Sequence, residues 1–188
     1  MSNVEMSHTR RGPWTVRGSR RIYAGEHLSL REDQVLQPNG QPGTYAVVEE
    51  PIGFGVVALS EDERVYLVGQ HRYAIDQYSW EIATGGAAEQ EQPLEGARRE
   101  LREETGLTAE EWTPLGGVHP NGSTWTAVTH LFLARRLTPG PSHTDSSEDL
   151  QIRQVPLSAA VRMCDRSEIT HAPSVVALYR TWRLLHGG

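Results

Sequence analysis

Hydrophobic residues along this chain change their spacing from one segment to the next, and these changes predict where strands and helices lie. Apolar and polar residues alternate around residues 28–30 and 45–47, on either side of the turn-forming sequence Pro-Asn-Gly at 38–40. Continuous apolar runs follow at residues 54–59 and 65–68. The alternating segments predict two strands joined by a turn, and the continuous runs predict central strands buried on both faces.

Further strands and helices follow from the spacing in the second half of the chain. Strand-like patterns occupy residues 79–84, 115–119, 127–134 and 152–155, and helical patterns occupy residues 93–105, 158–165 and 173–185. The elements interleave without the regular strand–helix–strand rhythm of a doubly wound sheet. We therefore expect an α/β (α+β) fold in which a mixed β-sheet lies between helices, as an α/β/α arrangement.

Charge and composition narrow the classes of function. The formal net charge is −6, which argues against a nucleic-acid binder with a basic surface. No apolar run approaches the length of about 20 residues that a membrane helix needs, and the N-terminal residues lack the apolar stretch of a signal peptide. We expect a cytoplasmic protein that binds a small molecule, with no nucleic-acid partner and no membrane partner.

The most informative segment is the predicted helix at residues 93–105, which carries Glu100, Glu103 and Glu104. Residues at positions i, i+3 and i+4 share one face of a helix, so these carboxylates converge. Like charges at this spacing destabilise an isolated helix, and hard divalent cations such as Mg²⁺ bind carboxylate oxygens. Gly106 should end the helix, since glycine readily takes the left-handed conformation found there.

A solvated acidic face is the ordinary explanation for a glutamate-rich helix, and the three glutamates alone do not exclude it. The wider pattern does, because residues 85–107 resemble the Nudix signature GX5EX7REUXEEXGU, where U is a bulky aliphatic residue. Every specified position is filled, by Gly85, Glu91, Arg99, Glu100, Leu101, Glu103, Glu104, Gly106 and Leu107.

The resemblance implies a Nudix fold and a metal-dependent catalytic site. By matching position, Glu100 and Glu104 are the main ligands of Mg²⁺ or Mn²⁺, and Glu103 shares the metal or orients the water. A backbone carbonyl near Thr84 or Gly85 is expected to complete the coordination. Bound metal would neutralise the pyrophosphate and help to activate water.

Three more residues receive roles from the same resemblance. Arg99 is expected to orient the glutamates through ion pairs, and Glu91 to hold the loop against the helix. Glu148 lies in the region where the family often carries a general base, with Asp149 as the alternative. An ordinary solvated loop carboxylate remains an equally good interpretation of Glu148.

Two segments before the signature are similar to ADP-ribose and nucleotide-sugar pyrophosphatases, at residues 70–73 and 80–86. Ala83 stands where that group usually has proline, and His71 where it usually has tyrosine. Arg72 and Glu81 are the residues of these segments that we expect to contact substrate. For Arg72, a surface ion pair is a comparably good interpretation.

The N-terminal region also resembles this group, in which it often crosses to a partner subunit. We expect residues 1–50 to form an antiparallel strand extension that contributes to a homodimer, and residues 51–188 to form the Nudix domain. Trp14 is the expected base-stacking residue there, although core packing explains such an aromatic side chain as well.

The resulting expectation is a Nudix hydrolase that cleaves the pyrophosphate of ADP-ribose or a nucleotide sugar, giving a nucleoside monophosphate and a sugar phosphate. Two alternatives remain open. One is a house-cleaning pyrophosphatase of nucleoside triphosphates, and the other is a non-catalytic Nudix domain that senses a ligand. The intact glutamates argue against the sensor, and the long region before the signature argues against the triphosphatase.

Overall fold

The computed structural model describes residues 9–88, 90–140 and 150–187, which belong to two compact units. The first unit is formed by Met1–Pro51 together with Asn121–Ala127, and the second by Ile52–Pro120 with Val128–Gly188. Among the described residues, no helix has the length and apolar character that crossing a membrane requires.

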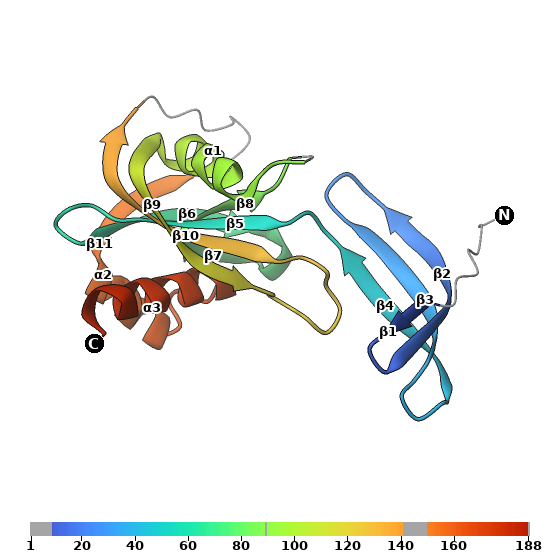
Figure 1. The fold of residues 1–188 in the computed structure, drawn as a ribbon. Coiled ribbons are helices and arrows are strands. Elements are labelled where there is room, and N and C mark those ends of the chain that lie inside the picture. Colours follow the sequence, from blue (N-terminus) through green and yellow to red (C-terminus); the bar gives the residue numbers. More distant parts are fainter. Residues whose placement is uncertain (1–8, 89, 141–149, 188) are drawn as a thin grey trace. The chain divides into compact units, whose positions relative to one another are not determined.

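The first unit is an antiparallel sheet with the strand order β1-β2-β3-β4 (Figure 1). Its strands are β1 (Thr9–Arg11), β2 (Trp14–Ala24), β3 (Ser29–Leu36) and β4 (Pro42–Glu49). The turn predicted at residues 38–40 joins β3 to β4, where the Gly40 amide donates to the carbonyl of Gln37 at 2.8 Å. Segment 121–127 is attached to this unit through Val48, whose amide donates to the Thr124 carbonyl.

The second unit contains two sheets, with strand orders β8-β5-β10-β9 and β11-β6-β7. Within it β5 and β10 are parallel and the other pairs are antiparallel, so the arrangement is mixed as expected. The strands are β5 (Gly53–Ala58), β6 (Arg64–Arg72), β7 (Gln77–Glu81), β8 (Ala83–Gly86), β9 (Leu107–Val118), β10 (Thr129–Pro139) and β11 (Gln151–Pro156), with a short 3-10 helix η1 (Tyr73–Ile75) between β6 and β7.

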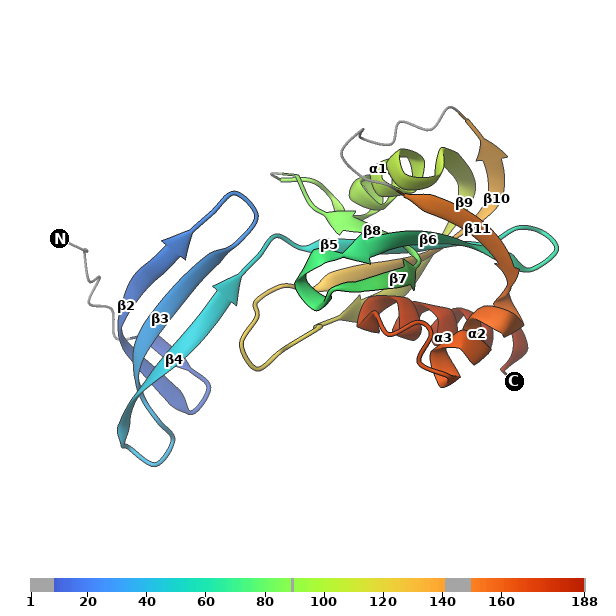
Figure 2. The same cartoon turned by 180° about the vertical axis from the view of Figure 1, so that it is seen from behind.

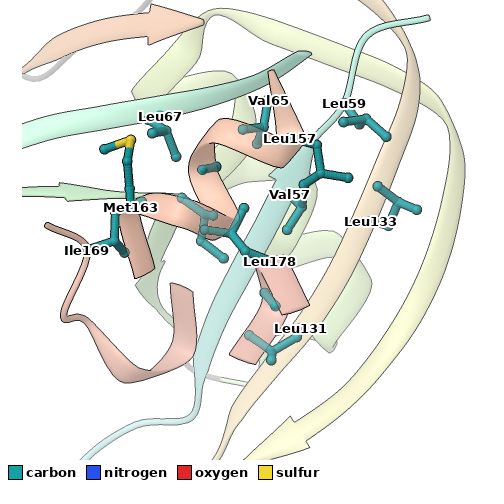
Figure 3. Close-up of a cluster of buried hydrophobic side chains, with 13 residues drawn as sticks. Val57, Leu59, Val65, Leu67, Leu131, Leu133, Leu157, Met163, Ile169 and Leu178 are labelled. Atoms are coloured by element: carbon teal, nitrogen blue, oxygen red, sulfur yellow. The ribbon is translucent and has the colours of Figure 1, made fainter. Parts of the chain in front are cut away.

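Helices cover both faces of these sheets, which confirms the α/β/α prediction (Figure 2). Helix α1 (Pro93–Thr105) packs on one face, while α2 (Leu157–Asp165) and α3 (Ala172–His186) pack on the other. Strand β5 lies between them, because successive side chains of a strand point to opposite faces. Phe54 and Val56 belong to the core under α1, whereas Val57 packs with Leu157 and Leu178 of the opposite helices (Figure 3).

Helix α1 has the bounds that the sequence predicts, and its two ends explain why. Pro93 occupies the first turn, where a missing amide proton costs nothing. Gly106 follows the helix with φ of 70°, and its amide donates to the carbonyl of Arg102, which confirms the predicted end. Gly96 lets the helix approach β5, since a Cβ there would lie 2.0 Å from the ring of Phe54.

Two strand predictions need correction, and one strand is not predicted from the spacing. The segment predicted as one strand at 79–84 is two strands, β7 and β8, which belong to different sheets. The strand predicted at 115–119 is the end of β9, which begins at Leu107. The prediction misses the first part because β9 pairs with β10 alone and carries exposed polar residues, which hide the alternation expected of a strand. Strand β2 is not predicted by the spacing, because apart from buried Val16 and Gly18 it is rich in exposed arginines.

Candidate functional site

Helix α1 directs two of its glutamates towards strand β8. The side chains of Glu100 and Glu104 are buried, at 7% and 8% exposure, whereas that of Glu103 is 40% exposed. The backbone amide of Thr84 on β8 donates to Oε2 of Glu104 at 2.8 Å. Helix and strand therefore hold one carboxylate directly against the backbone at the position where the sequence predicts metal coordination.

Glu100 lies even closer to this strand. A Cβ at Gly85 would be 2.1 Å from the carboxylate carbon of Glu100 and 2.1 and 2.2 Å from its two oxygens. Only glycine leaves room for a carboxylate at that distance. The first glycine of the signature therefore has a steric role, which is to let the helix carboxylate touch the β8 backbone.

Arg99 joins four groups around the glutamates. It donates to both carboxylate oxygens of Glu91, through Nε at 2.9 Å and Nη2 at 2.8 Å. Its Nη1 donates to Glu100 at 2.7 Å and to Glu103 at 2.9 Å, and Nη2 also donates to the carbonyl of Gly86. Arg99 thus links the loop after β8 to the acidic face of α1.

The pKa values of Glu100 and Glu91 are shifted in opposite directions. Burial raises the pKa of Glu100, and Arg99 offsets this only in part. Hydrogen bonds from Arg99 lower the pKa of Glu91 to about 2. Glu100 is consequently a buried carboxylate whose ionised form needs additional positive charge.

The donor set around β8 suits a hard divalent cation, although it supplies few protein ligands. Among the described residues no three His, Cys, Asp or Glu side chains gather closely enough to form a complete metal site. Mg²⁺ commonly binds through one or two carboxylates and takes its remaining ligands from water and substrate phosphates. Glu100 and Glu104 meet that requirement, and Gly85 leaves the carboxylate of Glu100 unobstructed by a side chain.

A second polar cluster lies at the ends of β6 and β7. Arg72 donates to Glu81 through Nε at 2.9 Å and through Nη2 at 2.6 Å, so the two predicted substrate residues bind each other. Burial is the largest influence on the pKa of Glu81 and raises it, but the hydrogen bonds and charge of Arg72, together with the other polar neighbours, outweigh burial, and the pKa is lowered. Glu81 is therefore an ionised carboxylate inside the protein.

His171 and Ser174, at the start of α3, complete this cluster and are not predicted from the sequence. His171 Nδ1 lies 3.2 Å from Oε2 of Glu81 and 2.8 Å from Oγ of Ser174. The hydroxyl of Ser174 also accepts from the amide of Ile82 at 3.1 Å. Burial lowers the pKa of His171. No motif marks these residues, since only the fold brings the start of α3 to β7.

An open hollow connects the two clusters. It has a volume of about 220 Å³ and is lined by Arg72 and His171 from the second cluster and by Thr84 and Gly85 beside the glutamates. The other lining residues are Gly53, Phe54, Thr129 and Pro173. The structure thus brings together Arg72 and the predicted metal-binding edge, which are 12 or more positions apart in sequence.

The remaining predicted site residues are Trp14 and Glu148. Trp14 belongs to the first unit, where its ring packs edge-to-face on Tyr45 with centroids 5.5 Å apart. Both rings line a small hollow on that sheet, together with Asp33. Glu148 and its alternative Asp149 lie outside the described residues, so the choice of general base stays a prediction.

Comparison with known families decides what this arrangement is, because the NUDIX domain model matches residues 49–178. The chain belongs to the Nudix family. A second model, that of the nucleoside diphosphate sugar hydrolase N-terminal domain, matches residues 14–48 of this Nudix protein. Gly85 and the glutamates of α1 therefore lie within the matched Nudix domain.

Individual relatives of this Nudix protein agree with the family match. It is 27% identical over 159 residues to the ADP-ribose pyrophosphatase of Bacillus subtilis, covering 84% of this chain and 86% of the relative. It is 29% identical over 163 residues to the ADP-ribose pyrophosphatase of Mycobacterium tuberculosis, covering 85% and 79%. A crystal structure of an ADP compounds hydrolase has the same fold, with a TM-score of 0.80, 21% identity and coverage of 93% and 95%.

Proposed function

We propose that this Nudix hydrolase is a magnesium-dependent pyrophosphatase of ADP-ribose or a related nucleotide sugar. The observation that carries the proposal is the burial of Glu100 and Glu104 against β8, where Gly85 admits a carboxylate that needs positive charge. Two relatives are ADP-ribose pyrophosphatases, and the N-terminal match is to nucleoside diphosphate sugar hydrolases. The relatives and the N-terminal match both indicate a substrate in which a diphosphate joins a nucleoside to a second sugar.

The reaction is hydrolysis of a phosphoanhydride. Water attacks one phosphorus, the bridging P–O bond breaks, and a nucleoside monophosphate and a sugar phosphate leave. A Mg²⁺ or Mn²⁺ ion, when bound, would neutralise the phosphate oxygens and lower the pKa of water. Glu100 and Glu104 would hold the ion, and a base, for which Glu148 and Asp149 are the candidates, would accept the proton from water.

The remaining residues of the site hold these groups in place. Arg99 binds Glu100 and Glu103 with one nitrogen, and so keeps both carboxylates on the same side of α1. Arg72 lies in the hollow beside Thr84, where a guanidinium can bind substrate oxygens. Its orientation is set by two bonds to Glu81, so Glu81 positions Arg72.

We further propose a homodimer located in the cytoplasm, whose partners are small nucleotides and include neither nucleic acid nor a membrane. The net charge of −6 supports the small-molecule partner. The Trp14–Tyr45 pair offers aromatic surface on the first unit for a nucleobase. Light scattering of the purified protein would test the oligomeric state.

Substrate assays test the catalytic proposal. Purified protein with Mg²⁺ would be given ADP-ribose, ADP-, GDP- and UDP-sugars, dinucleotides and nucleoside triphosphates, and the products separated by chromatography. We expect a nucleoside monophosphate from ADP-ribose or a nucleotide sugar, and its loss in Glu104→Gln. The matched control is Glu95→Gln, because Glu95 is a 62% exposed side chain of the same helix.

Other outcomes would favour the alternatives. Turnover confined to triphosphates would replace the proposal with a house-cleaning pyrophosphatase. Binding of a nucleotide sugar without metal-dependent turnover of any compound would instead indicate a sensor. A Glu95→Gln variant as inactive as Glu104→Gln would show that the loss reflects a general disturbance of α1.

A further inference from the structure

The hollow beside β8 has chemical properties that distinguish between the two halves of a nucleotide sugar. The charged side chain that lines the hollow is that of Arg72. It is bound to ionised Glu81, so the positive charge of Arg72 and the negative charge of Glu81 cancel. Burial lowers the pKa of His171, and the ring is therefore neutral at physiological pH. The cluster on this wall carries no net charge, which suits hydroxyl groups better than a phosphate.

The other lining residues agree with a sugar. Thr84 and Thr129 bring hydroxyls to the hollow, whereas Phe54 and Pro173 are buried beneath it. The hydroxyl oxygen of Thr129 lies 3.1 Å from the place that a Cβ of Gly53, another lining residue, would take. A few polar groups of this kind can fix the orientation of a bound ligand in a small-molecule site.

The approach of Glu81 to Nδ1 of His171 favours one of the two neutral forms of the ring. An ionised carboxylate such as Glu81 can only accept hydrogen bonds. The approach of Nδ1 to Oε2 of Glu81, at 3.2 Å, is therefore favourable when Nδ1 bears the proton and shares it with Ser174. The neutral ring then has a lone pair on Nε2, since the hydrogen bond of one nitrogen fixes the state of the other.

The Nε2 atom is the part of His171 available to a ligand. Nδ1 is engaged with Glu81 and Ser174, and within the described part of the chain no group hydrogen-bonds to Nε2. The side chain is 29% exposed and lines the hollow. A lone pair in that position accepts from a hydroxyl and disfavours a phosphate oxygen, which is itself only an acceptor at neutral pH.

We propose that His171 is a specificity-determining residue, which recognises the sugar half of the substrate by accepting a hydrogen bond from a sugar hydroxyl through Nε2. This inference rests on the proposed function, because it assigns the sugar to the hollow beside the pyrophosphate-cleaving edge. Ser174 and Glu81 act as positioning residues that hold the ring in the accepting state.

Two substitutions separate recognition of the sugar from support of Glu81. In His171→Asn the amide nitrogen takes the place of Nδ1 and can still donate to Glu81, but nothing replaces Nε2. In His171→Gln the amide oxygen can take the place of Nε2, while the contact to Glu81 is lost. Both variants would be assayed with ADP-ribose, or the best nucleotide sugar, and with ADP methyl ester, which lacks a second sugar.

We expect His171→Asn to raise KM for the sugar substrate about tenfold, as for one lost hydrogen bond of a buried partner, with little change in kcat. Its kinetics with ADP methyl ester should match the wild type, and His171→Gln should restore most of the affinity for the sugar substrate. Loss in His171→Gln alone, or equal loss on both substrates, would overturn the inference and leave His171 a positioning residue for Arg72.

The result remains distinguishable from failure of the proposed function. If the wild-type protein turns over none of the compounds, the proposed function is contradicted. The role of His171 is then tested separately, by measuring with calorimetry how ADP-ribose and ADP methyl ester bind to the same variants. Weaker binding of ADP-ribose alone to His171→Asn supports the inference, and unchanged binding of both ligands overturns it. Thermal unfolding of each variant checks that the fold is retained.

Discussion

The carboxylate of Glu100 lies so close to the backbone of Gly85 that no residue with a side chain fits at position 85 without moving it. A Cβ on Gly85 would lie 2.1 Å from an oxygen of the Glu100 carboxylate, well inside van der Waals contact. The obstructing atoms are the end of a flexible side chain and not backbone, so the carboxylate can move away at moderate cost. A methyl group at this position would therefore displace the carboxylate oxygen that we propose to bind metal more than it would disturb the fold.

Gly85→Ala is expected to reduce kcat/KM by about 100-fold while lowering the free energy of unfolding by only about 1 kcal/mol. Gly86→Ala is the matched control, since nothing lies within 4 Å of a Cβ placed there. Steady-state kinetics and urea unfolding of both variants would measure the two effects. Equal activity of Gly85→Ala and Gly86→Ala would contradict the steric argument.

Glu100→Gln should stabilise the metal-free protein while abolishing its activity. The pKa of Glu100 is raised by burial, so its ionisation costs the folded state free energy once the pH exceeds the pKa of the unfolded chain. An uncharged amide of the same shape removes that cost, and we expect the free energy of unfolding to rise at pH 7.

The same variant tests metal binding without an activity assay. Mg²⁺ should raise the melting temperature of the wild type by mass action, and the increase should be much smaller in Glu100→Gln. A variant that is less stable than the wild type without metal, and that responds fully to Mg²⁺, would contradict both expectations. Differential scanning calorimetry with EDTA or with Mg²⁺ measures all four states.

Arg99→Lys should lower activity about 10- to 100-fold, because an ammonium cannot reproduce the planar contacts of Arg99 with Glu91, Glu100, Glu103 and the Gly86 carbonyl. Arg98→Lys is the control, since Arg98 forms an exposed ion pair with Glu95 on the same helix. Steady-state kinetics with Mg²⁺ compares the two. Similar activity of both variants would show that the fork of hydrogen bonds is dispensable.

The sequence predicts helix α1 well because local chemistry and spacing determine it. Pro93 and Gly106 mark its ends, and the positions of Glu100 and Glu104 on a 3.6-residue period place both beside the same strand. Arg99 contacts residues within the signature, so its neighbours can also be inferred from spacing. Only the steric role of Gly85 required the three-dimensional arrangement.

Other features depend on contacts between distant segments and leave little trace in the sequence. His171 meets Glu81 only because the fold brings the N-terminal end of α3 to the end of β7, and the two residues are separated by 90 positions. Strand β9 carries consecutive exposed residues along most of its length, and strand β2 is rich in arginine, so hydrophobic spacing does not identify them fully. Pairing with β10 and β3 forms these strands, and pairing is a tertiary property.

The hydrogen bonds between Glu91 and Arg99 should make the stability of the protein sensitive to acid. The folded pKa of Glu91 is about 2, below its value of 4.5 in a model compound. Its stabilising contribution is therefore complete above the unfolded pKa, and it is lost as the pH falls from about 4.5 towards 2. Glu91→Gln removes the ionisable group, so the difference in free energy of unfolding between wild type and variant should be largest at neutral pH and should shrink as the pH falls. Urea unfolding between pH 7 and pH 3 measures this difference, and a difference independent of pH would show that the ionisation of Glu91 does not contribute.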